Sequence, residues 1–148
     1  MDDIKYVICV DFDGTVVTHD FPEIGKPLAF AGQVLSDLVG NGHKLILWTM
    51  RSGEYLDAAV AWFEERGIPL WGVNENPEQI EWTTSPKAYA QIYIDDAALG
   101  CPTQMLFEHS RPAVNWHEVR KQLGERGLLP IYSEGNVTVS QDLVIKHL

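Results

Sequence analysis

The chain has 148 residues, of which 45% are hydrophobic and 10% aromatic, and this content predicts one globular domain rather than a disordered tail. Its 11 basic and 21 acidic side chains give a formal net charge of −10, which disfavours binding to nucleic-acid phosphates. No apolar run approaches the roughly 20 residues that cross a bilayer, and the first residues are acidic, unlike a secretory signal, so we expect a cytoplasmic protein without a membrane partner.

The first third of the chain predicts a strand, a loop and a helix. Residues 4–10 are rich in Val and Ile and are typical of a buried strand, in which Cys9 is a small apolar side chain. Residues 16–27 contain two prolines and a glycine and predict a loop or short hairpin. Residues 28–39 place apolar side chains on one side of a helix, which we expect to end at Gly40 and Gly42.

The middle of the chain continues the alternation of strand and helix. Residues 44–49 predict a second buried strand, and residues 54–66 predict the clearest helix, because apolar side chains recur at i, i+3, i+4 and i+7. Residues 70–73 predict a third strand. A short helix is predicted at residues 86–90, directly before a fourth strand at residues 92–94.

The last part of the chain completes the predicted fold. Residues 105–107 are a weaker candidate for a fifth strand, and residues 116–123 predict an amphipathic helix. This alternation predicts an α/β fold with a doubly wound, mostly parallel sheet and helices on both faces. We expect residues 1–127 to form the core and residues 128–148 an extension, either a hairpin on the core or an arm on a neighbouring subunit.

Polar side chains follow the predicted strands at the end where open α/β sheets bind their ligands. Each of them alone is also typical of a turn, a helix cap or a solvated side chain, and only the ordered set points to one crevice. The set consists of Asp11 and Asp13 after the first strand, Thr49 at the end of the second, Lys87 ahead of the fourth, and Asp95 and Asp96 after it.

These residue types suit phosphoryl transfer. The carboxylates of Asp11 and Asp96, with a backbone carbonyl near Asp13, are the hard oxygen ligands that Mg²⁺ prefers. The Thr49 hydroxyl and the Lys87 ammonium can hold the non-bridging oxygens of a phosphate. One carboxylate can then attack phosphorus, while the other moves a proton to the leaving alcohol and later from water.

In these motifs the chain resembles the haloacid dehalogenase-like (HAD) hydrolase superfamily. The first motif, an apolar strand followed by Asp-x-Asp-Gly-Thr, is matched by residues 11–15, and the second, a strand ending in Thr or Ser, by residues 45–49. Lys87 matches the lysine of the third motif, and residues 93–96 match the fourth, a strand ending in an acidic pair. The resemblance covers residues 4–107, which is most of the chain.

This resemblance implies a Rossmann-like fold and a Mg²⁺-dependent phosphatase with an aspartyl-phosphate intermediate. Asp11 is the implied nucleophile and Asp13 the general acid/base, since phosphatases of the superfamily carry an acid at that second position. Asp96 is the implied metal ligand of the fourth motif and Asp95 its hydrogen-bonding support, although the sequence leaves the order of these neighbours open. The implied metal site therefore draws on Asp11, Asp13, Asp95 and Asp96.

The gaps between the motifs are too short for a large cap domain, which is typical of capless members. The resemblance then implies that residues 17–26 form a small flap over a small phosphorylated substrate, and it leaves open a homo-oligomer in which a neighbouring subunit supplies the lid. Arg51 is a candidate second phosphate contact. Residues 74–76 either line the pocket or form a turn, and His19 is expected to be a solvated loop residue, because no second His or Cys has metal-binding spacing.

Two other functions remain open on the sequence alone. A nucleic-acid end-phosphatase also fits a capless member, but the net charge of −10 disfavours it. A phospho-accepting receiver domain also combines acids with a Thr and a Lys on a doubly wound sheet. Its acid pair lies on the first strand and its phosphorylated Asp on the third, whereas here the second acidic pair comes after Thr49 and Lys87.

Overall fold

A four-stranded parallel sheet forms the centre of the protein in a computed structural model that describes residues 4–131. The strands are β1 (Val7–Val10), β2 (Lys44–Leu47), β3 (Gly72–Val73) and β4 (Ile92–Ile94), in the spatial order β3-β2-β1-β4. Val10 of β1 is level with Leu47 of β2 and with Ile94 of β4. The strands predicted from runs of Val, Ile and Leu are therefore confirmed, and their carboxyl ends lie at one edge of the sheet.

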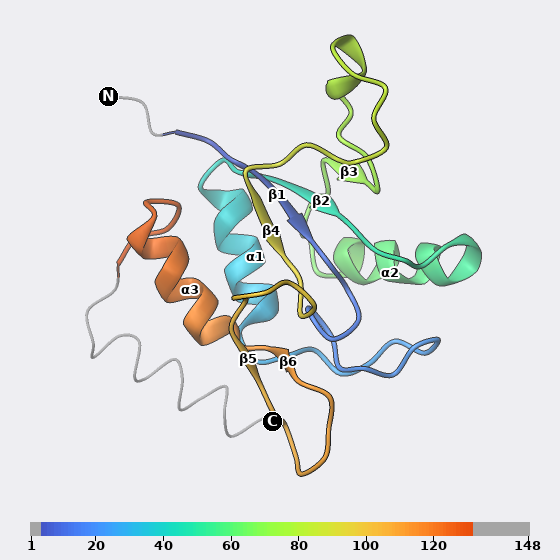
Figure 1. Ribbon diagram of the computed structural model, residues 1–148, viewed down its shortest axis with the longest axis vertical. Coiled ribbons are helices and arrows are strands. Elements are labelled where there is room, and N and C mark those ends of the chain that lie inside the picture. Colours follow the sequence, from blue (N-terminus) through green and yellow to red (C-terminus); the bar gives the residue numbers. More distant parts are fainter. Residues whose placement is uncertain (1–3, 132–148) are drawn as a thin grey trace.

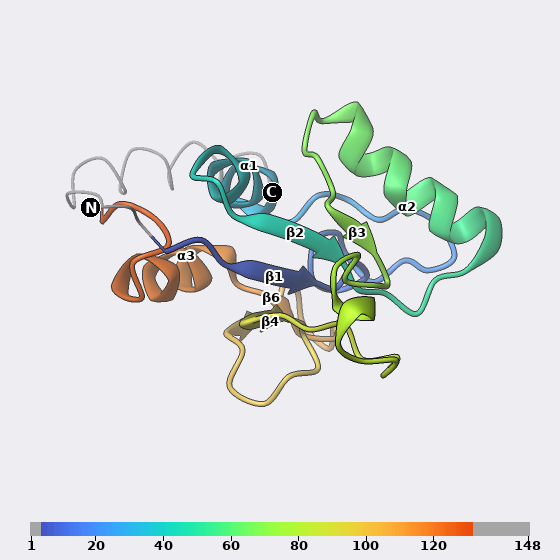
Figure 2. The same ribbon diagram turned by 90° about the horizontal axis from the view of Figure 1, so that it is seen from above.

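Within the described residues, three α-helices complete the core. They are α1 (Ala31–Gly40), α2 (Gly53–Glu65) and α3 (Trp116–Glu125), and each contributes buried side chains to one cluster with Ile8 and Val10 of β1. Figures 1 and 2 show α1 between α3 and α2 in both views. The α/β architecture with a parallel sheet is thus confirmed. In the described part of the chain, no helix is both long and apolar enough to cross a membrane.

The prediction of helices on both faces of the sheet holds for one face only among residues 4–131. The opposite face, which carries Cys9 and Ile46, packs on Ala88 of the segment 74–91. This segment contains one turn of 3-10 helix (Gln79–Glu81), and the helix predicted at residues 86–90 is wrong. The side chain of Gln79 bonds to the backbone at residues 85, 87 and 89, and these bonds hold the segment without a helix.

Two further boundaries differ from the prediction. The first helix begins at Ala31, three residues after its predicted start, because Phe30 adopts a left-handed backbone conformation with φ 70°. The strand predicted at residues 105–107 is wrong, since the chain forms a short antiparallel pair of β5 (Thr103–Gln104) and β6 (Ala113–Val114) instead. Of the predicted extension, residues 128–131 are described and Leu128 is buried, whereas residues 132–148 lie outside the described part.

The order of the strands fixes where a ligand can bind. From β1 the chain moves through α1 to β2 and through α2 to β3, always in one direction, and then returns to place β4 on the other side of β1. The crevice outside the carboxyl ends of β1 and β4 is therefore the topological switch point, where open α/β sheets bind their ligands.

Candidate active site

Three carboxylates meet at this switch point. Asp11 directly follows β1, and Asp95 and Asp96 directly follow β4. One oxygen from each of them can be chosen so that all three lie within 4.8 Å of one another. The Asp11 N–H donates to the carbonyl of Ile94 at 3.0 Å, so the backbone itself keeps the two strand ends together.

Thr15 connects the acids to each other and to the core. It is fully buried, and its hydroxyl lies 2.8 Å from Oδ2 of Asp11 and accepts the backbone N–H of Asp96 at 3.1 Å. Its carbonyl accepts the indole N–H of Trp116, the first residue of α3, at 2.6 Å. Thr15 therefore sets the distance between the ends of β1 and β4 and is itself held by α3.

Burial, and to a smaller extent the neighbouring acids, raise the pKa of Asp11. Burial raises the pKa of Asp11 from its ordinary 3.8 to about 7; the Thr15 hydrogen bond lowers that pKa, whereas the charge of Asp95 and a hydrogen bond with Asp96 raise it. A cation placed among these oxygens reverses this balance by favouring the ionised form. The donor set of hard carboxylate oxygens fits Mg²⁺.

A cavity of about 290 Å³ opens beside the acids. Its lining draws on the ends of all four strands of the sheet and comprises Asp11, Trp48, Thr49, Met50, Asn74 and Asp95. The side-chain oxygen of Asn74 accepts the Thr49 N–H at 2.8 Å and so joins the ends of β2 and β3. The structure thus brings Thr49 to the acids, as the sequence predicts, and it places Asn74 in the pocket.

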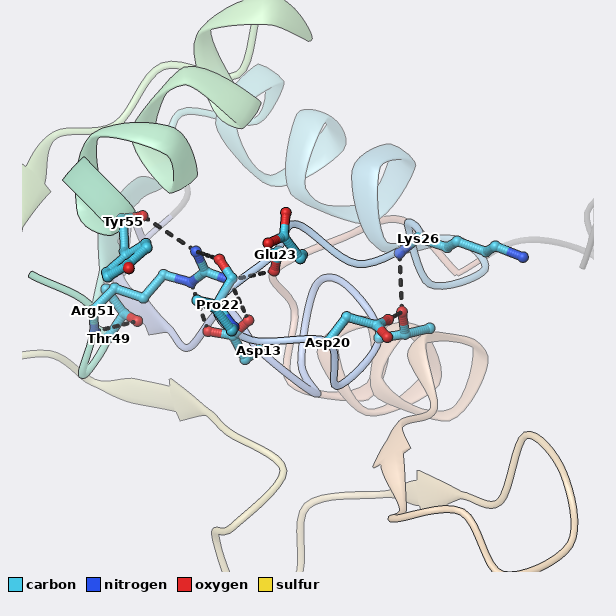
Figure 3. Close-up of polar contacts among 9 residues, drawn as sticks. Asp13, Asp20, Pro22, Glu23, Lys26, Thr49, Arg51 and Tyr55 are labelled. Carbon is cyan, nitrogen blue, oxygen red and sulfur yellow. Dashed lines mark hydrogen bonds and ion pairs between the residues drawn. The ribbon is translucent and has the colours of Figure 1, made fainter.

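The Asp13 side chain pairs with Arg51. Its two carboxylate oxygens accept from Nε and Nη2 of Arg51 at 2.8 and 2.7 Å, a bidentate pair (Figure 3). Arg51 is only 3% exposed. The structure therefore brings these two predicted site residues together, but as partners of each other.

Lys87 contacts an aromatic ring and does not line the cavity beside the acids. Its side chain is exposed, and its ammonium lies 5.6 Å from the centre of the Tyr93 ring. It does not belong to the lining of the 290 Å³ cavity. The helix predicted at residues 86–90, which would have oriented the Lys87 side chain, does not form.

His19 lies at the acid cluster. Its Nε2 is 3.4 Å from Oδ2 of Asp96 and 3.0 Å from the carbonyl of Pro112. The ring occupies the space that a side chain on Gly14 would need, and Gly14 has the positive φ of 77° that glycine adopts readily. His19 lies in a loop, as predicted, but the prediction of a solvated side chain is wrong, because the ring packs against Gly14 and is only 16% exposed.

Comparison with solved structures identifies a relative. The conserved protein coded by a locus of Bacteroides thetaiotaomicron is 35% identical to this chain, and the match covers 83% of this chain and 93% of that one with a TM-score of 0.68. The chain belongs to the family of this Bacteroides protein. No family model and no curated protein matches the chain.

Membership of the Bacteroides family supports the fold, whereas the chemistry rests on the residues of the site. Sequence reasoning missed the contacts of Thr15 and His19, although both lie within or close to the first motif. The signal for Thr15 was its place in the turn after β1. No local pattern signals the His19 contact, because its partners Asp96 and Pro112 are far away along the chain.

Proposed function

We propose that the protein is a Mg²⁺-dependent phosphatase of the capless HAD type, acting on a small phosphomonoester. The observation that carries the proposal is the cluster of Asp11, Asp95 and Asp96 at the switch point of the sheet, beside a cavity that Thr49 lines together with the first two of these acids. Three acids this close together are stabilised by a shared proton or by a cation, and a cation beside a cavity that Thr49 lines suits the binding of a phosphate group.

The residues divide the reaction between them. Asp11 and Asp96, with Asp95 beside them and the backbone carbonyl of Asp13, would hold Mg²⁺, and the bound cation would neutralise the charge of the phosphate. An oxygen of Asp11 forms a bond to phosphorus while the bond between phosphorus and the substrate's alcohol oxygen breaks. Asp13 gives that oxygen its proton and later takes one from the water that releases phosphate from Asp11.

The remaining predicted residues have supporting parts. The Thr49 hydroxyl and the Lys87 ammonium bind non-bridging phosphate oxygens, and for this the Lys87 side chain leaves the ring of Tyr93. Arg51 gives its hydrogen bonds to protein groups in this arrangement, so its predicted role as a phosphate contact requires it to release Asp13.

The test is release of inorganic phosphate from a panel of phosphorylated metabolites by the full chain, with Mg²⁺ and with EDTA. We expect turnover with Mg²⁺ only, none with Asp11→Asn, and a loss of roughly 10²–10⁴-fold with Asp13→Asn. Asp57→Asn, an exposed acid on α2, is the matched control and keeps wild-type activity.

Three results would contradict the proposal. Wild-type activity in Asp11→Asn rules out attack by that carboxylate. A stable phosphoprotein without phosphate turnover indicates a signalling module of the receiver kind. Hydrolysis confined to oligonucleotide ends, with steep salt dependence, indicates an end-phosphatase.

A further inference from the structure

Arg51 is the most completely bonded polar side chain around the site. Besides the two bonds to Asp13, its Nη2 donates to the carbonyl of Glu23 at 2.8 Å. Its Nη1 donates to the carbonyls of Pro22 at 3.2 Å and Tyr55 at 3.3 Å. A guanidinium has five N–H groups, and all five have protein acceptors here (Figure 3).

Two aromatic rings complete the enclosure of this cation. The guanidinium carbon lies 5.1 Å from the centre of the Phe12 ring and 5.1 Å from that of Phe21. Phe12 belongs to the core beside Asp13, whereas Phe21 belongs to the flap and is 58% exposed. Arg51 therefore lies between the turn that follows β1 and the flap, in contact with both.

The contacts join the flap to Asp13 through one rigid group. Pro22 and Glu23 lie in residues 17–26, which fold back as a hairpin because the Thr18 N–H donates to the Lys26 carbonyl at 2.9 Å. The guanidinium is planar and rigid. The positions of the two flap carbonyls and of the Asp13 carboxylate, which all bond to it, are therefore fixed relative to one another. A shift of the flap would therefore move the guanidinium and, with it, the hydrogen-bond partner of the Asp13 carboxylate.

We infer that Arg51 is a positioning residue, which orients Asp13 for proton transfer and makes that orientation depend on the flap. The inference rests on the proposed function, since Asp13 is the group that moves the proton there. The sequence predicts that Arg51 contacts the phosphate directly. In this inference Arg51 instead acts through Asp13. It also gives the flap a means of regulating a site that has no large cap.

The experiment compares two substrates of similar size with different leaving groups. p-Nitrophenol leaves readily without a proton, whereas the alcohol of benzyl phosphate needs one. Arg51→Lys keeps the charge but loses the bidentate fork. We expect kcat for benzyl phosphate to fall by roughly 10²-fold or more, the scale of acid catalysis, while kcat for p-nitrophenyl phosphate falls less than about tenfold and KM stays unchanged.

Arg66→Lys is the matched control. Arg66 directly follows α2, stacks on Trp62 at 4.0 Å and donates to its carbonyl, but contacts neither Asp13 nor the flap. Wild-type kinetics are expected for this variant. Equal losses on both substrates in Arg51→Lys, as a merely structural role would give, overturn the inference. A rise in KM alone also overturns it, because that result assigns Arg51 to phosphate binding.

A second readout does not depend on activity. Amide hydrogen exchange of residues 17–26 is expected to accelerate at least tenfold in Arg51→Lys and not in Arg66→Lys, because only the first loses contacts with the flap carbonyls. Phe21→Leu, at an exposed flap position, preserves the fold and is expected to shift exchange and leaving-group preference in the same direction. If hydrogen exchange of the flap is unchanged in Arg51→Lys, the coupling between Arg51 and the flap is wrong. If exchange changes but the wild-type protein turns over no phosphate ester, only the proposed phosphatase function is contradicted.

Discussion

Asp11 is the residue at which stability and the proposed chemistry conflict. A partly buried carboxylate beside two others is unfavourable in the metal-free protein, and the raised pKa of about 7 expresses this cost. Thr15 offsets part of it with a hydrogen bond of 2.8 Å. The site therefore tolerates local destabilisation that a neutral side chain would remove.

The first prediction concerns the pH dependence of this cost. Because the pKa of Asp11 is raised from 3.8 to about 7, the folded protein binds a proton more tightly than the unfolded chain between these values. The contribution of Asp11 to the free energy of unfolding therefore falls as the pH rises from about 4 to about 7, and levels off above. Asp11→Asn lacks this contribution and is expected to be more stable than wild type at pH 8 by about 1–3 kcal/mol.

The measurement is urea unfolding of both proteins at pH 5 and pH 8 with EDTA present. The stability difference between Asp11→Asn and wild type is expected to widen at the higher pH, while Asp57→Asn shows no such change. A difference that stays constant between the two pH values contradicts the raised pKa.

At this scale the acids of the site could be predicted and their partners could not. Asp11 and Asp95 directly follow β1 and β4, and Thr49 lies two residues after the end of β2, so the parallel sheet brings them to one edge. The bonds of Arg51 and His19 depend on how the flap folds back, and nothing in the local sequence determines that path.

At the scale of elements, the segment 74–91 takes the place that a helix was predicted to occupy. Gln79 is only 8% exposed, donates to the carbonyls of Ser85 and Lys87 at 3.0 and 2.9 Å, and accepts the Tyr89 N–H at 2.7 Å. These bonds satisfy backbone groups that a helix would have satisfied itself. Strands and amphipathic helices could be predicted because their periodicity is local, whereas this segment depends on a side chain six to ten residues away.

The second prediction tests this side chain. Gln79→Leu removes three hydrogen bonds from partly buried backbone groups of the segment, so we expect the free energy of unfolding to fall by about 1–3 kcal/mol. Hydrogen exchange at residues 85–91 should accelerate. Glu78→Gln, a neighbouring exposed position, is the control and should change stability by less than about 0.5 kcal/mol. Equal stability of the two variants would show that the segment is held by its apolar contacts instead.

At the scale of the whole molecule, charge and topology act on the same point. The chain carries a net charge of −10, and the strand order places three of its acids at the switch point of the sheet. Self-repulsion of this kind destabilises a compact state, and general screening by salt relieves it without any specific site. A bound cation relieves the same repulsion at one position, and the two effects can be separated.

The last prediction makes that separation. Mg²⁺ that binds the folded protein alone stabilises it by RT ln(1 + [Mg²⁺]/Kd), which is about 2.7 kcal/mol at a hundredfold excess over Kd. For a chain of this length that gain raises the melting temperature by roughly 5–10 °C. NaCl of equal ionic strength should give a smaller rise, and Asp96→Asn should lose the excess due to Mg²⁺ while keeping the effect of NaCl. If Mg²⁺ and NaCl raise the melting temperature of the wild type equally, the three acids are only part of a negative surface and do not form a metal site. The metal-dependent reaction proposed for them is then contradicted as well.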